Sequence, residues 1–157
     1  MRAIVGVLMF SLAQFAIAAD AENIVVKLYH DYAWEAVIQE PDNPDVGLMQ
    51  APRSTLERYF DTSLVNLIIQ DRKCVERTHE ICRLDFLPIW GGQDPAATEL
   101  SITPTNNPSL VHVKFLYPSN REIIELTYNL SKGVKGWRIN NIIAANWDLR
   151  HILSSKQ

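Results

Sequence analysis

The spacing of apolar residues divides this chain into a first half with helical periodicity and a second half with strand periodicity. In the first half, apolar side chains recur at intervals of three and four residues, which places them on one face of a helix. This stripe consists of Val25, Leu28, Tyr29, Tyr32, Ala36 and Val37. We therefore expect a helix from about Glu22 to Ile38, ended by the turn segment Pro41–Pro44.

Two shorter helices are expected between that turn and the cysteines. Ser54 and Glu57 have the spacing of a capping box, in which a hydroxyl and a carboxylate accept backbone N–H groups at a helix start. Thr62 or Ser63 can cap the next helix, which should run to about Cys74. Its buried face is expected to hold Leu64, Leu67 and Ile68.

After Cys82 the period becomes two, which is typical of strands with one buried face. An extended stretch is expected to begin at Leu84–Phe86, and Leu100 and Ile102 form the first alternating pair. The later inward sets are Val111, Val113, Phe115 and Tyr117, then Ile124, Leu126, Tyr128 and Leu130, then Trp137, Ile139 and Ile142. Turn residues separate these sets, which predicts antiparallel hairpins, and residues 147–153 predict a short closing helix.

This order of elements indicates an α+β protein. Three helices precede three or four long strands in hairpin connection, and a small helix follows them. Helices and a sheet that each have one apolar face must bury those faces against each other. We expect N-terminal helices packed on one face of a curved antiparallel β-sheet.

The first 18 residues have the pattern of a secretory signal peptide. Arg2 precedes an apolar run from Ala3 to Ala13, and Ala16 and Ala18 have the small-residue spacing of a cleavage site. The alternative is that this segment stays as an N-terminal membrane anchor, but the run is short for a membrane span. No cysteine stands at the cleavage site to take a lipid. We therefore expect a signal peptide at 1–18 and one periplasmic domain at 19–157, with no membrane anchor after cleavage.

The charge of the mature chain disfavours two classes of partner. Cleavage would remove Arg2 from the 15 basic residues and leave the 18 acidic residues, so the mature net charge is −4. Nucleic acids and anionic membranes attract a basic surface, and the mature chain is mildly acidic. We expect neither as a partner.

Cys74 and Cys82 are the two cysteines of the chain. An even number of cysteines in an exported protein predicts a disulfide, because the compartment is oxidising. The alternative is a metal site made by these cysteines and His79, but a fourth ligand at suitable spacing is missing. We expect the disulfide, with no metal and no cofactor.

Three segments give the chain a resemblance to a known family. They are LERYF at Leu56–Phe60, LDFLPI at Leu84–Ile89 followed by Gln93 and Asp94, and GWRINNI at Gly136–Ile142. With the order of elements, they resemble small exported bacterial proteins that carry a domain of unknown function in the nuclear transport factor 2-like (cystatin-like) cone fold. The similarity covers about residues 22–154. Many such relatives are lipoproteins, and this chain lacks their lipid-bearing cysteine.

The resemblance implies a pocket between the first helix and the concave sheet, so polar residues near that pocket are candidates. Gln93 and Asp94 follow Trp90 and two glycines in a loop expected at its mouth. Asp94 could act as a general base, or it could end a turn by accepting backbone N–H groups, and we favour the turn. Trp90, beside the glycines, is the tryptophan expected to present its ring at the surface.

Two other pairs of polar residues lie on predicted elements. His30 and Asp31 are expected to face solvent beside the buried Tyr32, because neighbours on a helix diverge by about 100°. His112 and Lys114 alternate with an apolar set on one strand, so we expect them on the outer face of the sheet, available to a partner.

The sequence contains no motif for a nucleophilic serine, a phosphate loop or a dinucleotide site. The absence of these motifs, together with predicted export, small size and acidic charge, favours a binding protein without catalytic activity. The hypothesis is an inhibitor or immunity protein whose partner is a secreted toxin or cell-wall hydrolase. The alternative is a small-molecule-binding or isomerase-like domain that uses the cone pocket.

Overall fold

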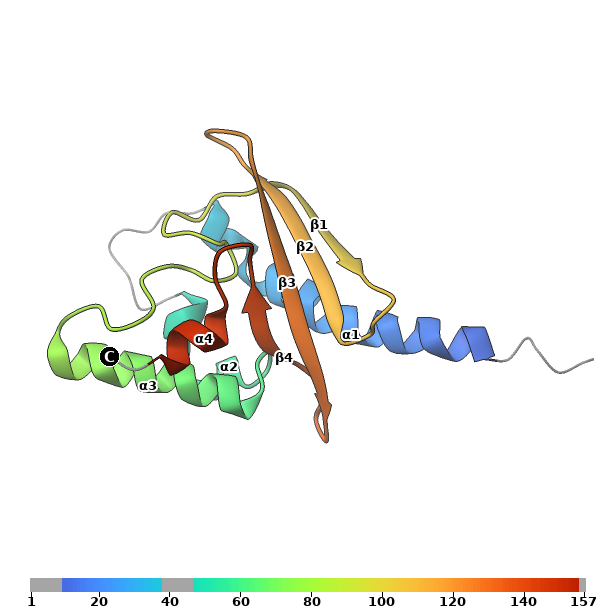
Figure 1. Cartoon of the computed structure of the whole chain (residues 1–157), viewed down its shortest axis with the longest axis horizontal. Coiled ribbons are helices and arrows are strands. Elements are labelled where there is room, and N and C mark those ends of the chain that lie inside the picture. The colour runs from blue at the N-terminus through green and yellow to red at the C-terminus, as the bar shows by residue number, and fades with distance from the viewer. Residues whose placement is uncertain (1–9, 38–46, 156–157) are drawn as a thin grey trace, which may run out of the picture.

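The computed structural model of this protein describes residues 10–37 and 47–155, with side chains from residue 21 onward. In chain order its elements are α1 (Phe10–Tyr32), the 3-10 helices η1 (Ala33–Ala36) and η2 (Leu48–Gln50), α2 (Arg53–Leu56), α3 (Thr62–Thr78), β1 (Thr98–Pro104), β2 (Leu110–Tyr117), β3 (Glu122–Gly133), β4 (Gly136–Ile143) and α4 (Leu149–Ser154). Figure 1 shows α1 crossing behind the sheet while α3 and α4 gather beside β4. The α+β class and the short C-terminal helix are confirmed.

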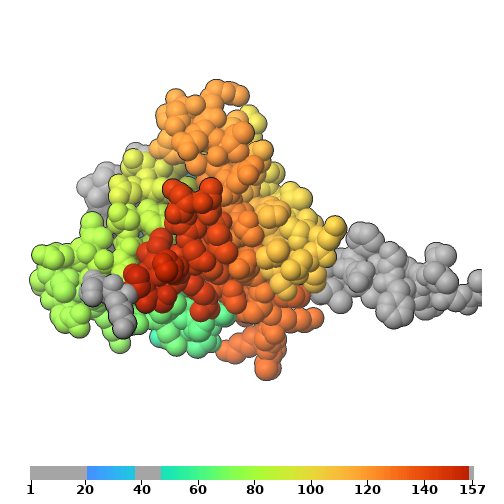
Figure 2. Space-filling model, viewed as in Figure 1, coloured from blue at the N-terminus to red at the C-terminus, as the bar shows by residue number. Residues whose placement is uncertain are grey.

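The four strands form one curved sheet in the order β1-β2-β3-β4, and each strand is antiparallel to its neighbour. Val113 lies opposite Leu126, and Tyr128 lies opposite Ile142, so the inward sets of adjacent strands face α1 together. This register buries six of the eight predicted inward residues of β2 and β3 to at most 5% exposure, whereas Tyr117 and Ile124, near the β2–β3 turn, are only partly buried. The β2–β3 and β3–β4 turns project at opposite ends of the molecule (Figure 2).

The first strand departs from the predicted alternation. Ile102 is partly buried, but Leu100 is 41% exposed, although both were expected to face inward. The pairing of β1 with β2 is irregular between Thr98 and Ser101, and Glu99 within that interval has a φ of 55°. A bulge shifts the side-chain alternation by one residue, so Leu100 turns toward solvent.

The first helix begins earlier and ends earlier than its apolar stripe predicted. The backbone is already helical at Phe10, and α1 ends at Tyr32, where η1 tightens the chain. The predicted turn at 41–44 lies outside the described residues. The predicted signal peptide at 1–18 begins outside them too, and only the backbone is described for residues 10–18, within α1. The signal peptide and its cleavage stay predictions.

The helix caps differ from the predicted ones. Ser54 lies inside α2, which begins at Arg53 after an extended Pro52, and Glu57 pairs with Arg53 at 3.3 Å, so the capping box is wrong. Asp61, rather than Thr62 or Ser63, caps α3 by accepting the backbone N–H of Leu64 at 2.7 Å. A carboxylate one residue earlier also meets the positive end of the helix dipole.

The extended stretch predicted to begin at Leu84–Phe86 lies in a loop, residues 83–91, outside the four-stranded sheet. Asp71 of α3 accepts the backbone N–H groups of Arg83 and Leu84 at 3.0 and 3.3 Å. Because a helix side chain satisfies these donors, the segment follows α3 instead of joining the sheet.

The segment around Asp61 connects α3 and α4 to β4. The backbone N–H of Asp61 donates to the carbonyl of Ile139, and the backbone N–H of Ile139 donates to the carbonyl of Tyr59. Arg150 of α4 donates from Nη2 to both carboxylate oxygens of Asp61 at 2.9 and 3.0 Å. These contacts extend the core beyond β4, where Leu64 and Ile68 are buried with Ile139.

Candidate functional site

The space between α1 and the sheet, where the resemblance placed a pocket, is filled by aromatic rings. Tyr29 packs edge to face against Trp90 and Tyr128, with ring centroids 5.3 and 6.1 Å apart. Trp90 packs in the same way against Phe115 at 5.8 Å. All four side chains are at most 3% exposed. Edge-to-face rings at these distances interlock, so this part of the molecule is core.

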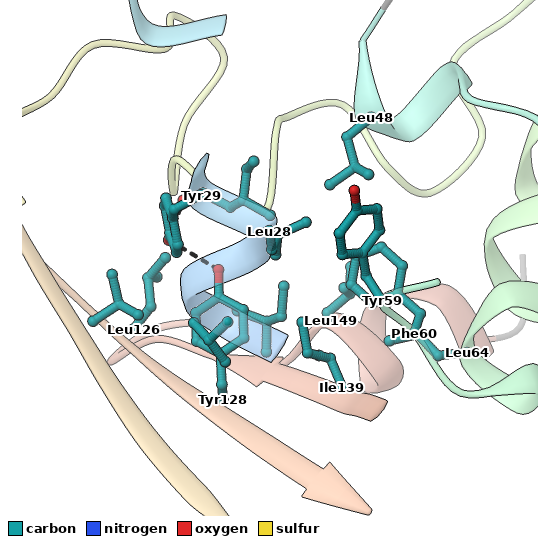
Figure 3. Packing of buried hydrophobic residues seen from close by; sticks show 14 of the residues in the cluster. Leu28, Tyr29, Leu48, Tyr59, Phe60, Leu64, Leu126, Tyr128, Ile139 and Leu149 are labelled. Atoms are coloured by element: carbon teal, nitrogen blue, oxygen red, sulfur yellow. Dashed lines mark hydrogen bonds between the residues drawn. The ribbon is translucent and has the colours of Figure 1, made fainter. Parts of the chain in front are cut away.

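A directed hydrogen-bond chain runs through these rings. The hydroxyl of Tyr29 donates to the carbonyl oxygen of Ile89 at 2.7 Å and lies 2.9 Å from the hydroxyl of Tyr128. Figure 3 shows the two hydroxyl groups facing each other between α1 and β3. Burial raises the pKa of both phenols well above the ordinary value. Both tyrosines therefore stay protonated and serve as a structural link.

Glu35 is a buried carboxylate that the sequence interpretation missed. Its Oε1 accepts the backbone N–H of Leu48 at 2.6 Å, and its Oε2 accepts Nε1–H of Trp90 at 2.9 Å. Burial raises the pKa of this carboxyl, and the two hydrogen bonds oppose that change. Since both oxygens are engaged, Glu35 joins η1, η2 and Trp90 and is closed to a ligand. The sequence signal for its burial is its spacing: Glu35 lies seven residues after Leu28, on the same helical face.

Trp90 was expected at the surface, and that prediction is wrong. The side chain is 3% exposed, its ring lies between Tyr29 and Phe115, and its N–H reaches Glu35. Gly91 follows with a φ of 70°, so the glycine supplies the turn that directs the ring inward rather than room for an exposed ring.

The other candidate residues do not form one site. Gln93 and Asp94 are exposed, and Gln93 approaches the Asp85 carboxylate at 3.5 Å. His112 and Lys114 are exposed on the other face of the sheet, with His112 Nδ1 3.1 Å from the Thr127 hydroxyl. Lys114 also lies 3.4 Å from Glu125. These residues belong to separate surfaces.

Asp31 forms a local network with its neighbours. The hydroxyl of Tyr59 donates to it at 2.5 Å, Lys27 Nζ lies 2.6 Å away, and His30 Nδ1 lies 3.0 Å away. The hydrogen bond from Lys27 first, then those from Tyr59 and His30, holds the pKa of Asp31 well below its usual range. As predicted, His30 is exposed, while Asp31 is partly covered and links α1 to Tyr59.

The predicted disulfide between Cys74 and Cys82 is present, with Cα atoms 6.1 Å apart. His79, the third member of the alternative metal set, ends α3 in a left-handed conformation with a φ of 58°. Within residues 10–37 and 47–155, no three histidine, cysteine or acidic side chains are grouped as metal ligands.

A surface groove of about 720 Å³ lies between α3, η2 and the loop after Cys82. Its α3 wall is built from residues spaced three and four apart, which share one helix face. They are Ile68, Asp71, Arg72, Val75, Glu76 and His79. The opposite walls consist of Met49, Gln50, Leu84, Asp85, Phe86, Leu87 and Gln93. The sequence interpretation did not identify this groove, because polar and apolar residues alternate along its helix face.

Two consecutive residues of α3 hold the groove walls in place. Asp71 is 6% exposed and accepts the N–H groups of the loop, as described above. Arg72 donates from Nη1 and Nη2 to the carbonyl of Ala51 at 2.9 Å, and from Nη1 to that of Gln50 at 3.3 Å. Burial lowers the pKa of Arg72, while the charge of Glu76 acts in the opposite direction. The guanidinium thus serves to fix η2.

Comparisons with known proteins give a fold and no activity. No family model matches this chain, and no curated protein matches it. The crystal structure of a protein of unknown function from Bacteroides thetaiotaomicron VPI-5482 resembles it with a TM-score of 0.55 at 15% identity. The likeness covers 84% of this chain and 95% of that chain. It shows a shared α+β fold. In the described part of the chain, no helix has the length and apolar character to cross a membrane.

Proposed function

We propose that this protein is an exported, periplasmic binding protein without catalytic activity, which inhibits or neutralises a protein partner such as a secreted toxin or a cell-wall hydrolase. We also propose that its domain is a member of the nuclear transport factor 2-like cone folds, in a form whose interior is closed. Both proposals extend the α+β architecture described above.

The filled interior is the observation that carries this proposal. An enzyme that used the space between α1 and the sheet would need a desolvated acid or base within reach of a ligand. Here that space holds Tyr29, Trp90, Phe115 and Tyr128, and the carboxylate of Glu35 is occupied by two donors of the protein itself. A groove of about 720 Å³ lies on the surface beside α3, outside this filled interior, which favours recognition at the surface.

The charge of the chain supports a basic partner. Its formal net charge is −3, and removal of the signal peptide would also remove Arg2. Complementary charge accelerates encounter between two proteins and disfavours partners of like charge. An acidic domain of this size is suited to a basic enzyme that acts on a wall or on nucleic acid.

The small-molecule or isomerase-like alternative makes a different prediction about the interior. It requires that ligand enter between α1 and the sheet, which would separate the Tyr29 ring from Trp90 or Tyr128. Asp94, its proposed base, is exposed and lies outside that aromatic core. We therefore favour the surface-binding function.

The test is affinity purification from periplasmic and secreted fractions, followed by reconstitution of the complex from purified components. We expect a defined protein partner that binds the purified domain and whose toxic or hydrolytic activity falls when the domain is added. Asp94→Ala should retain the partner. Recovery of a small ligand in place of a protein, with turnover that Asp94→Ala abolishes, would establish the isomerase-like alternative.

A further inference from the structure

We propose that the groove between α3, η2 and the loop 84–93 binds a peptide segment of the protein partner, one that carries lysine or arginine beside an apolar side chain. This inference rests on the proposed binding function and names the surface and the chemistry that it recognises.

The walls of the groove are fixed before any partner arrives. Asp71 holds the loop through two backbone N–H groups, and Arg72 holds η2 through two backbone carbonyls. The disulfide between Cys74 and Cys82 closes the end of α3 onto the start of the loop. Phe86 also holds the loop in place, because its ring packs against that of Trp147 with the two ring centroids 4.9 Å apart. A site with fixed walls loses little conformational entropy when it binds.

The lining supplies apolar contact. Met49 and Ile68 are buried and form the floor, Leu84 and Phe86 are partly buried, and Val75 is 38% exposed. An apolar side chain of the partner that covered these groups would remove their surface from water, which is the main source of affinity in such contacts. The volume of about 720 Å³ admits a few side chains and excludes a whole globular domain.

The charges of the lining select a cation. Among the described residues that line the groove, Asp71, Glu76 and Asp85 are acidic, but Asp71 is buried with a carboxylate oxygen 3.8 Å from the Arg83 guanidinium. One lining residue is an arginine. That arginine, Arg72, directs its guanidinium to the carbonyls of η2. Glu76 and Asp85 are exposed on opposite walls, so a lysine or arginine between them would meet two carboxylates. An acidic side chain of the partner would be repelled by the same two carboxylates. The groove is therefore expected to prefer a basic peptide over an acidic one.

The experiment measures fluorescence anisotropy of short labelled peptides mixed with the full mature domain. One peptide alternates lysine with leucine and phenylalanine, and a second peptide has glutamate in place of each lysine. We expect the lysine peptide to bind and the glutamate peptide to bind at least about tenfold more weakly, since two rim charges change from attraction to repulsion.

Three variants locate the binding. Val75→Arg places a cation in the groove, and Glu76→Lys combined with Asp85→Lys reverses its exposed charges; each should weaken the lysine peptide about tenfold or more. Glu125→Lys reverses one charge, half of the charge change in that double variant, at an exposed site on the outer sheet face, and should leave the affinity within about twofold. Melting curves verify that all three variants are folded.

Equal binding of both peptides, or equal weakening by Glu125→Lys, would overturn the groove assignment, as would a lysine peptide that does not bind. The partner complex separates this result from the proposed function. If Val75→Arg retains the protein partner as strongly as the unmodified domain does, the groove inference is wrong and the binding function stands. If the unmodified domain retains no protein, the proposed function fails whatever the peptides do.

Discussion

The hydroxyl of Tyr128 donates its hydrogen bond to the hydroxyl of Tyr29, 2.9 Å away, because the single proton of Tyr29 is directed to the carbonyl oxygen of Ile89. Tyr29 is thus both donor and acceptor, while Tyr128 is the end of the chain. The link connects α1, β3 and the loop before Trp90 inside the core, where both tyrosines are at most 2% exposed.

This direction of the hydrogen bonds predicts that the two tyrosine hydroxyl groups contribute unequally to the free energy of unfolding. Tyr128→Phe removes one hydrogen bond and leaves Tyr29 bonded to Ile89, so it should lower the free energy of unfolding by about 1 kcal/mol. Tyr29→Phe leaves both the Ile89 carbonyl and the Tyr128 hydroxyl unpaired in the core, so the loss should be about 2 to 4 kcal/mol. Denaturant unfolding of the two variants measures the difference. Equal losses would contradict the direction of the chain.

Glu35 should make stability depend on pH in a definite direction. Burial raises its pKa in the folded state above the ordinary value of 4.5, so the folded protein binds this proton more tightly than the unfolded chain. The Glu35 contribution to stability is therefore complete below about pH 4.5 and is lost as the pH rises through the raised pKa. Asp31, with a lowered pKa, acts in the opposite direction but only below its ordinary value of 3.8.

Glu35→Gln tests this effect by denaturant unfolding at several pH values above 4.5. The variant should lose the part of the pH slope that is due to Glu35. Its amide places an N–H group against either the Leu48 N–H or the Trp90 N–H, so it should also be less stable by about 1 to 3 kcal/mol. An unchanged slope would mean that Glu35 has an ordinary pKa.

Loss of the disulfide should destabilise the domain without unfolding its sheet. Cys74 and Cys82 are eight positions apart, and the chain-entropy model for so short a loop gives about 2.5 kcal/mol. Replacing both cysteines by serine should lower the free energy of unfolding by about that amount. Thiol titration of the unmodified protein should detect no reactive thiol, and two titratable thiols with bound zinc would contradict the assignment.

The contribution of Trp137 should be smaller than a fully buried tryptophan would give. Its ring is partly buried on β4, with the Lys132 ammonium 5.7 Å from the ring centroid. Trp137→Ala should cost about 1 to 2 kcal/mol, whereas Leu126→Ala, at 1% exposure, should cost about 2 to 5 kcal/mol. Thermal and denaturant unfolding of the two variants measures which substitution lowers the free energy of unfolding more. A larger decrease for Trp137→Ala would show that the Trp137 ring lies deeper in the core.

The sequence by itself determined the elements whose signals are local. The period-two sets of β2 and β3 predicted which side chains face inward, because alternation in a strand follows from the geometry of consecutive residues. In β4 the buried Ile139 and Ile142 are three residues apart, because the pairing with β3 is irregular between them. The compartment suggested by residues 1–18 predicted the pairing of Cys74 with Cys82, and the structure contains that pair. The α+β class followed from the order of the elements.

Only the tertiary structure decided the features that depend on residues distant in sequence. Trp90 is buried because Glu35, 55 positions earlier, accepts its N–H, and a glycine-flanked tryptophan gives no sign of such a partner. The groove exists because Asp71 and Arg72 bind backbone groups of two other segments, and backbone groups leave no trace in side-chain patterns. Local periodicity reports which face of an element is apolar; the packing of elements decides which space is filled and which remains open to a partner.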